Sequence, residues 1–275
     1  IAYFRRKPGQ AHSIERLFDS IKSCLSDGYE ASTHPVPYSA GHPLKTIYNG
    51  LWARSRQGDI NHIEGAEYYL ALFLGRKRTV VTYHDSSPLD NSEGFFLKRW
   101  LYWVLWFVLP CLCATRVTVI SEASKQRLLA YVPIGGEHIS VIPNCVPPEY
   151  KHSYAEFDTA CPRLLFVGTK PNKNLKRVVD AIQGLSCELR IIGPLNATQK
   201  RQLAEAKIDY SSSANIPDQQ MLEEYKQCDI VVFPSLYEGF GMPILEGQAV
   251  GRPVVTSDIP PMCDVSGNGA VRVDP

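Results

Sequence analysis

Hydrophobic and polar positions alternate along this chain with two periodicities. Short runs rich in β-branched residues are typical of buried strands, and they are separated by stretches in which apolar positions recur at helical spacing. In the first half, the expected strands are residues 1–4, 59–63, 78–85 and 116–121, and the expected helices are 13–25, 44–56, 67–74 and 122–132. This alternation predicts an α/β domain with a doubly wound parallel sheet covered by helices.

The same alternation begins again after a proline-rich segment. Residues 141–162 (VIPNCVPPEYKHSYAEFDTACP) show neither the strand nor the helix periodicity, which is typical of a linker. We place the boundary near residue 150, giving domains 1–150 and 151–275. In the second domain, the expected strands are 163–168, 188–193, 208–212, 229–234 and 252–257, and the expected helices are 173–185, 197–207, 217–228 and 242–250. Two such Rossmann-like domains are expected to face a cleft in which a ligand binds.

Residues 94–116 (GFFLKRWLYWVLWFVLPCLCATR) fit neither periodicity, because they are dense in tryptophan and leucine. The uncharged run from Trp100 to Thr115 contains Pro110 and is shorter than a membrane span. A buried helix is the favoured interpretation. The alternative is a helix whose aromatic face touches a membrane, with peripheral contact through residues 95–113.

Composition limits the classes of partner. The 29 Lys and Arg residues balance 28 Asp and Glu residues, so the net charge does not favour a nucleic-acid partner. The eight cysteines form no Cys-x-x-Cys pair and no histidine cluster has zinc spacing, so no metal site is expected. Scattered thiols indicate a reducing compartment, and the first residues lack the length and order of a signal peptide, so we expect a cytoplasmic protein.

The stretch 235–257 (SLYEGFGMPILEGQAVGRPVVTS) carries the clearest chemistry. A helix is expected to begin near Met242, because proline is tolerated in a first turn. Gly239 and Gly241 allow close approach of the backbone, and the amides around Phe240, Gly241 and Met242 suit a phosphate or diphosphate.

Two glutamates stand on either side of this glycine turn. A carboxylate repels a phosphate, so Glu238 and Glu246 are expected to accept hydrogen bonds from hydroxyl groups. Glu246 would bind a ribose, as an acidic residue does in dinucleotide sites, and Glu238 would meet the group beyond the phosphates. The turn is therefore interpreted as a binding site for a nucleotide diphosphate sugar. Carboxylates that merely satisfy the amides of a helix terminus are the plainer interpretation.

The pattern EGFGMPILE resembles the donor-site motif of the family 4 retaining glycosyltransferases, which have the GT-B fold. Residues 163–182 (RLLFVGTKPNKNLKRVVDAI) resemble the start of their C-terminal domain, and VTVISEASKQRL, VIPNCV and VTYHD resemble parts of their N-terminal domain. The resemblance covers nearly the whole chain. It implies an acceptor-side domain at 1–150 and a nucleotide-sugar-binding domain at 151–275.

The resemblance also implies roles for individual residues. Lys173 is similar to the lysine that neutralises the departing diphosphate, Glu238 to the glutamate on the donor sugar, and His84 to a histidine near that sugar. A solvated lysine and a core histidine are the plainer interpretations of Lys173 and His84, and His62 is a weaker candidate. The implied donor contacts are Gly9, Gly168, Thr169, Gly239, Phe240, Gly241, Met242 and Glu246.

Two features depart from the family pattern. Many relatives carry an arginine where this chain has Thr169, so Lys170 or Arg177 would have to compensate, or Lys173 would act alone. Relatives also continue through further helices beyond the position of Pro275, so the resemblance implies an incomplete C-terminal domain.

The resulting hypothesis is a retaining, metal-independent glycosyltransferase without a cofactor, acting in bacterial polysaccharide or glycoconjugate synthesis. It would move a sugar from a nucleotide diphosphate donor to a glycan or lipid-linked acceptor, in the cytoplasm or on the inner face of the membrane. The alternatives are a nucleotide-sugar epimerase, a sugar phosphorylase on a related scaffold, and a non-catalytic nucleotide-sugar-binding protein.

Overall fold

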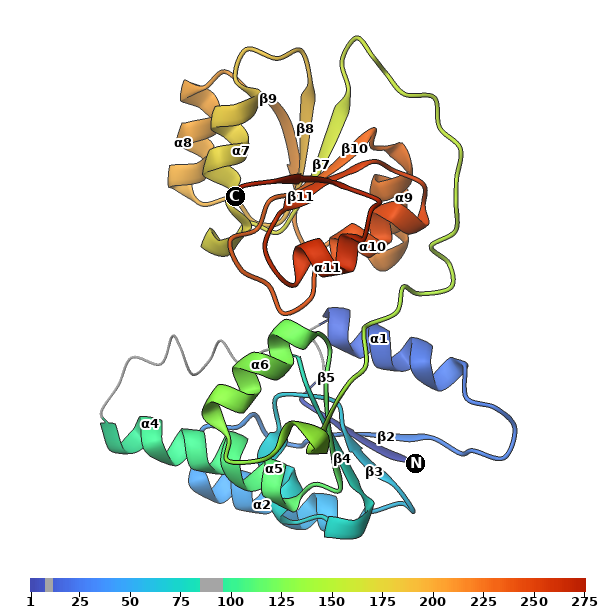
Figure 1. Ribbon diagram of the computed structural model, residues 1–275, viewed down its shortest axis with the longest axis vertical. Helices are drawn as coiled ribbons and strands as arrows, with labels where there is room; N and C mark the ends of the chain where they lie inside the picture. The colour runs from blue at the N-terminus through green and yellow to red at the C-terminus, as the bar shows by residue number, and fades with distance from the viewer. Residues whose placement is uncertain (8–11, 85–95) are drawn as a thin grey trace. The chain divides into compact units, whose positions relative to one another are not determined.

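The computed structural model describes residues 1–7, 12–84 and 96–275. Its contacts divide the chain into two compact units, Ile1–Pro147 and Pro148–Pro275. Each unit is built around its own six-stranded sheet, in which all paired strands run parallel (Figure 1).

The first unit has strand order β2-β1-β3-β4-β5-β6. Its strands are β1 (Ala2–Arg5), β2 (Ser32–Pro35), β3 (Asn61–Ile63), β4 (Thr79–Tyr83), β5 (Arg116–Val119) and β6 (Ile139–Val141), and its α-helices are α1 (His12–Ser23), α2 (Pro43–Arg54), α4 (Phe96–Trp103), α5 (Leu109–Cys113) and α6 (Glu122–Tyr131). From β1 to β2 the chain moves toward one edge of the sheet, and from β2 onwards it moves toward the opposite edge. Right-handed crossovers therefore place α1 on one face of the sheet and α2, α4, α5 and α6 on the other.

The second unit has strand order β12-β11-β10-β7-β8-β9. Its strands are β7 (Arg163–Val167), β8 (Glu188–Ile192), β9 (Asp209–Ser213), β10 (Ile230–Phe233), β11 (Val254–Ser257) and β12 (Val271–Val273), and its α-helices are α7 (Leu175–Ile182), α8 (Ala197–Glu205), α9 (Asp218–Gln227), α10 (Met242–Ala249) and α11 (Met262–Ser266). Here too the direction reverses, between α8 and α9. Figure 1 accordingly shows α7 and α8 on one face and α9, α10 and α11 on the other.

Each sheet contributes the apolar side chains of its own core. Phe4, Ile63 and Val81 are fully buried in the first unit, and Phe166, Leu189 and Ile191 are buried in the second. Parallel strands covered on both faces bury consecutive apolar residues, which is why these segments read as continuous hydrophobic runs.

Most expected elements are confirmed, and the differences have local causes. The expected helix at 67–74 is a 3₁₀ helix, η1 (Tyr68–Leu72). Three strands were missed by the sequence reasoning: β2, β6 and β12. The β2 sequence STHP is short, polar and mostly exposed, so its hydrophobic pattern carries no strand signal.

The tryptophan-rich segment forms a continuous helical stretch from α4 through a π-helical turn, η3 (Val104–Val108), to α5. Pro110 has no amide hydrogen to donate to the carbonyl of Trp106 four residues earlier. The hydroxyl of Tyr83 donates to that carbonyl instead, at 3.0 Å, and the amide of Leu109 bonds the carbonyl of Val104 in the π pattern. The wide turn therefore has an identifiable cause. Among the helices of the described residues, none is both long and apolar enough to cross a bilayer.

Candidate active site

The sheet of the second unit has its reversal point between β7 and β10, which are neighbours. The chain leaves β7 toward β8 and leaves β10 toward β11, so the loops after these two strands diverge to opposite faces. Open α/β sheets bind ligands at the carboxyl ends of the strands at such a point. The loop after β7 holds Gly168 and Lys173, and the loop after β10 holds Glu238 and Gly241.

Backbone and amide hydrogen bonds fasten these two loops together. The amide of Leu236 donates to the carbonyl of Asn172 at 2.8 Å, and Asn172 Nδ2 donates to the carbonyl of Tyr237 at 2.8 Å. Asn174, in the left-handed conformation with φ of 66°, donates from Nδ2 to the carbonyl of Pro234 at 3.1 Å. The loop that carries Lys173 is thereby held against the loop that carries Glu238.

Lys173 and Glu238 meet directly. Lys173 Nζ lies 2.6 Å from Glu238 Oε1 and 4.5 Å from the centroid of the Phe233 ring. Gly168 has φ of +91°, and a Cβ there would lie 2.8 Å from Lys173 Cε. Glycine at this position therefore lets the lysine stem lie along the end of β7. The two residues expected to act on the donor are brought together by the fold.

Helix α10 begins beside this ion pair. Its N-cap is Gly241, with φ of +114°, and Pro243 occupies the first turn. Gly241 has no side chain to cap the helix, Pro243 has no amide hydrogen, and the amide of Ile244 donates to the carbonyl of Gly241 at 3.0 Å. An anion at this terminus would therefore meet the amide of Met242 and those of the glycine turn before it. Phe240 is buried beneath the turn, and Met242 is the first helical residue, as the sequence predicted.

Glu246 lies in α10 with only 4% of its surface exposed. Its Oε2 accepts a hydrogen bond from the Tyr225 hydroxyl at 2.6 Å. Tyr225 lies in α9 and is fully buried, and burial followed by the charge of Glu246 raises its pKa well above the ordinary value. The phenol therefore stays a donor and fixes the carboxylate. Sequence reasoning missed Tyr225, whose only signal was its place beside Leu222 on the apolar side of a helix.

Thr169 contributes to loop structure rather than to charge. Its hydroxyl donates to the carbonyl of Pro194 at 2.7 Å, and its own carbonyl accepts from Gln199 Nε2 at 2.7 Å. A Cβ on Gly193 would lie 2.9 Å from Thr169 Cγ2, so the loops after β7 and β8 are in close contact. The position at which the family resemblance implied an arginine joins two loops here.

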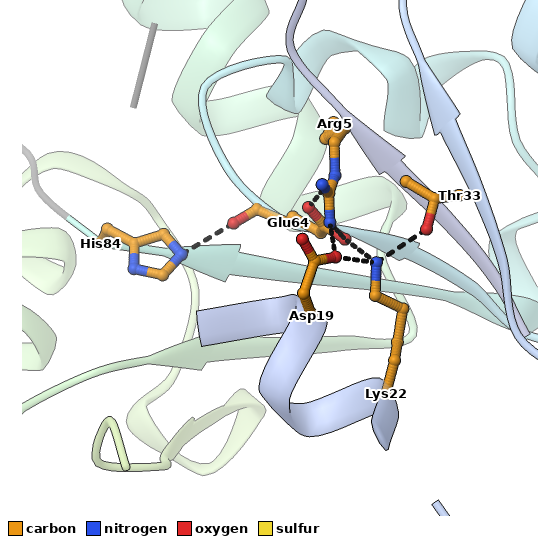
Figure 2. A network of polar contacts seen from close by, with 6 residues as sticks. All are labelled: Arg5, Asp19, Lys22, Thr33, Glu64 and His84. Carbon is orange, nitrogen blue, oxygen red and sulfur yellow. Dashed lines mark hydrogen bonds and ion pairs between the residues drawn. The ribbon is translucent and has the colours of Figure 1, made fainter. Parts of the chain in front are cut away.

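The sheet of the first unit reverses between β1 and β3, and a charged cluster occupies that point (Figure 2). Arg5 donates from Nε to Glu64 Oε2 at 2.8 Å and from Nη2 to Asp19 Oδ1 at 2.8 Å. Lys22 Nζ lies 2.6 Å from Asp19 Oδ1 and 2.7 Å from Thr33 Oγ1. Burial raises the pKa of Glu64, and its bond to Arg5 opposes that shift. The cluster ties β1, α1 and β2 to the end of β3.

His84 follows β4, as predicted, and is buried. Its Nε2 lies 2.7 Å from the backbone carbonyl of Glu64, as Figure 2 shows. A carbonyl oxygen only accepts, so Nε2 carries the hydrogen. This bond is the one expected of a core histidine held by the neighbouring loop, and it also fixes the orientation of the ring. Gly9, the other candidate in this unit, lies outside the described residues.

His62, in β3, is enclosed by apolar rings. Its ring stacks on Tyr3 with centroids 5.3 Å apart and meets Phe18 edge-on at 5.1 Å. Nε2 lies 2.8 Å from Thr82 Oγ1. Burial, with a smaller contribution from His84, lowers the pKa of His62 to about 4. His62 is therefore a neutral structural residue near pH 7.

Two family models match the chain, one over each unit. Residues 26–150 match Glycosyltransferase Family 4, and residues 161–275 match Glycosyl transferases group 1. The chain belongs to glycosyltransferase family 4. Each match overlaps one of the two sheets, and the match over residues 161–275 contains the whole arrangement of Lys173, Glu238 and α10.

The family 4 chain also matches curated proteins at modest identity. It is 27% identical over 266 residues to O-antigen chain mannosyltransferase B of Escherichia coli, covering 86% of this chain and 66% of the relative. It is 26% identical over 208 residues to O-antigen chain mannosyltransferase RfbU of Salmonella typhimurium, covering 72% of this chain and 57% of the relative. A match to the serotype-specific mannosyltransferase WbdA of Escherichia coli covers 26% of that protein, so the chain spans from a quarter to about two thirds of these relatives.

Solved structures share the fold. WaaG, a glycosyltransferase involved in lipopolysaccharide biosynthesis, aligns with a TM-score of 0.72 at 13% identity, covering 100% of this chain and 86% of its own. HepE of Anabaena, in complex with UDP and glucose, aligns with a TM-score of 0.69 at 14% identity, covering 100% of this chain and 85% of its own. The family 4 chain thus has the GT-B fold of two Rossmann-like domains.

Proposed function

We propose that this chain is a retaining glycosyltransferase that moves a hexose from a nucleotide diphosphate sugar to a hydroxyl of a glycan or lipid-linked acceptor. Support comes from the arrangement at the end of β7 and β10, where Lys173, Glu238 and the N-terminus of α10 converge. The mannosyltransferase names of the relatives support a hexose donor and a role in bacterial polysaccharide or glycoconjugate synthesis.

The donor diphosphate would sit against the α10 terminus, where backbone amides and the helix dipole favour negative charge. Lys173 is held near that terminus by its contact with Glu238. As the bond between the sugar and the diphosphate breaks, charge grows on the leaving oxygen, and a fixed ammonium group stabilises it. We infer that this positive charge comes from the protein, without a metal or a cofactor.

The ion pair between Lys173 and Glu238 has a consequence for binding. In the ligand-free protein the two charges neutralise each other at 2.6 Å. A diphosphate would draw Lys173 toward itself, which leaves Glu238 to accept hydroxyl hydrogens from the donor sugar. Glu246, held by Tyr225, would accept the ribose hydroxyls. Both glutamates then serve as hydroxyl acceptors and not as the acid and base of a hydrolase, which must flank a glycosidic bond.

On this proposal the protein mainly positions its substrates. The leaving phosphate would take the proton of the acceptor hydroxyl on the same face of the sugar, so the anomeric configuration is retained and no protein nucleophile is required. His84 is proposed as a contact of the donor sugar, and the bond that orients its ring on the Glu64 carbonyl supports this role.

The test combines donor screening with product analysis. Thermal shift against UDP, GDP and ADP sugars identifies the donor, because a ligand that binds the folded state raises the melting temperature. With that donor, release of nucleotide together with a new glycoside supports transfer. A changed nucleotide sugar would indicate an epimerase, a sugar phosphate formed with phosphate would indicate a phosphorylase, and binding without turnover over an acceptor panel would indicate a binding protein.

A lysine pair provides the matched control. Lys173→Ala is expected to abolish most turnover, whereas Lys176→Ala, which removes an exposed lysine paired with Asp180 in α7, leaves it unchanged. Equal turnover in both variants would remove Lys173 from the mechanism.

We also propose a peripheral contact of residues 95–113 with the inner face of the cytoplasmic membrane. Leu97, Trp100 and Leu101 are exposed along one side of α4, which supports this position for a protein that acts on lipid-linked acceptors. Residue 95 lies outside the described residues.

A further inference from the structure

The second unit begins with a segment that forms neither helix nor strand, residues 148–162, which we call the strap. It runs as a long loop into β7 (Figure 1). Its two tyrosines and one phenylalanine have different surroundings: Tyr154 and Phe157 are 85% and 44% exposed, whereas Tyr150 is 6% exposed. Loops normally lie over the surface, so a ring buried at one place indicates that the strap is held against the rest of the unit there.

Arg252 fastens the strap to two helices. Its Nη1 donates to the carbonyl of Ser153 at 2.9 Å, and its Nη2 donates to the carbonyl of Lys226, in α9, at 2.6 Å. The amide of Ser153 donates to the carbonyl of Val250, just after α10, at 3.1 Å. Arg252 is buried, so breaking these bonds would leave a charged group unpaired away from water. The strap is therefore joined to the C-terminal ends of both α9 and α10.

The turn after α10 allows the strap to come close. Gly251 has φ of +84°, a conformation that residues with a Cβ rarely adopt, and a Cβ there would lie 2.6 Å from Cδ2 of His152. The ring of His152 therefore lies directly on the backbone of the turn. Further along, Asp229 accepts from the amide of Asp158 at 3.0 Å and from the amide of Arg163 at 2.7 Å. The course of the strap is thus fixed by contacts at several places.

Tyr150 packs on the residue that holds Glu246. Its ring meets the ring of Tyr225 edge-on, with centroids 5.7 Å apart and planes at 67°, a geometry that aromatic pairs prefer. Tyr225 is fully buried, and its hydroxyl donates to Glu246 Oε2 at 2.6 Å. Because this hydroxyl stands at the end of a rigid ring, any tilt of the ring moves it relative to the carboxylate. The donor on Glu246 is therefore placed by the contact between the two rings.

We propose that Tyr150 is a positioning residue for the ribose of the nucleotide. It acts through Tyr225, whose phenol it keeps on Glu246, so that the carboxylate is already oriented to accept the ribose hydroxyls. A group that is fixed before binding loses less conformational freedom when the ligand arrives, and the affinity rises accordingly. The inference rests on the proposed function in one respect, the assignment of Glu246 to the ribose.

Isothermal titration calorimetry on the whole chain tests the proposal. The probes are UDP, GDP and ADP, followed by the 2′,3′-dideoxy form of the one that binds most tightly, which lacks the hydroxyls that Glu246 would accept. Tyr150→Leu keeps an apolar side chain and removes the ring. It is expected to weaken binding of the nucleoside diphosphate about fivefold and to leave the affinity for the dideoxy form unchanged. A purely structural role would weaken both.

Two further variants serve as controls. Tyr150→Phe keeps the ring and should retain the affinity of the wild type. Tyr154→Leu makes the same leucine substitution at the exposed tyrosine of the strap and should have no effect. Circular dichroism confirms that each variant is folded.

Hydrogen exchange of the wild type adds a measurement that needs no variant. Coupling between two sites is reciprocal, so a nucleotide that binds better when Tyr150 is packed on Tyr225 must also favour the fastened strap. Exchange of the Ser153 amide, which donates to the carbonyl of Val250, should therefore slow about fivefold with saturating nucleoside diphosphate and stay unchanged with the dideoxy form.

Several results would overturn this inference alone. They are wild-type affinity in Tyr150→Leu while Glu246→Ala binds weakly, an equal loss of affinity for both forms of the nucleotide, a Tyr150→Phe variant that binds as weakly as Tyr150→Leu, and a Ser153 amide whose exchange is the same with and without nucleotide. Unchanged affinity in Glu246→Ala, or a wild-type chain that binds none of the three diphosphates, would overturn the proposed donor site and this inference together.

Discussion

Acidification should destabilise the first unit through His62. The ring is enclosed by Tyr3 and Phe18 and bonded to Thr82, and its pKa falls from 6.5 to about 4. In the unfolded chain the imidazole regains its ordinary pKa. Between these two values the unfolded state binds more protons, so the free energy of unfolding falls as pH falls. The stabilisation is complete above pH 6.5 and is lost as pH decreases toward 4.

The size of the effect follows from the two pKa values. At pH 5 the unfolded histidine is almost fully protonated and the folded one is mostly neutral, which costs about 2 kcal/mol relative to pH 7.5. His62→Phe keeps an aromatic ring between Tyr3 and Phe18 and removes the titration. The variant is therefore expected to lose about 2 kcal/mol less than the wild type over this pH interval.

Tryptophan fluorescence is a suitable probe because all four tryptophans, at 52, 100, 103 and 106, lie in the first unit with His62. Urea titrations at pH 7.5 and pH 5 give the free energies of unfolding. His138→Gln, which changes an exposed histidine, should follow the wild type and serves as the control. Parallel pH profiles for the wild type and His62→Phe would show that His62 titrates normally and would refute the argument.

Further predictions concern the second unit. Lys173→Ala should lose about 2–4 kcal/mol of transition-state stabilisation in steady-state kinetics with only a modest change in donor affinity; a large affinity loss with normal turnover at saturation would contradict this. Glu246→Ala should weaken donor binding in calorimetry more than it slows the bound enzyme, and unchanged affinity would remove the ribose assignment. Tyr225→Phe leaves a buried carboxylate without this donor and should lower the free energy of unfolding by about 1–3 kcal/mol; urea unfolding equal to the wild type would show that another donor replaces the phenol. Gly168→Ala should cost about 1–2 kcal/mol of stability, because φ there is +91°, and should displace Lys173; a variant with normal melting and turnover would contradict the close approach.

The hydrophobic pattern was enough to predict two α/β units and most of their strands. Continuous apolar runs such as 163–168 and 229–234, alternating with amphipathic helices, are typical of a parallel sheet covered by helices on both faces. The glycines and Pro243 likewise predicted the turn and the start of α10, because backbone conformation near glycine and proline is a local property. The strands β2 and β12 escaped prediction, since they are short edge strands whose exposed residues leave no periodic signal.

What the sequence by itself determined about this protein is therefore its alternation of strands and helices and the glycine turn with its two glutamates. Only the tertiary structure decided the partners: Lys173 against Glu238, Tyr225 against Glu246, and Arg5 with Lys22 around Glu64. These pairs join residues far apart in the chain, and their meeting depends on strand order and on the direction in which each crossover runs. The packing of Tyr150 on Tyr225 was also decided there, because the irregular pattern of the strap does not state which of its aromatic residues is buried.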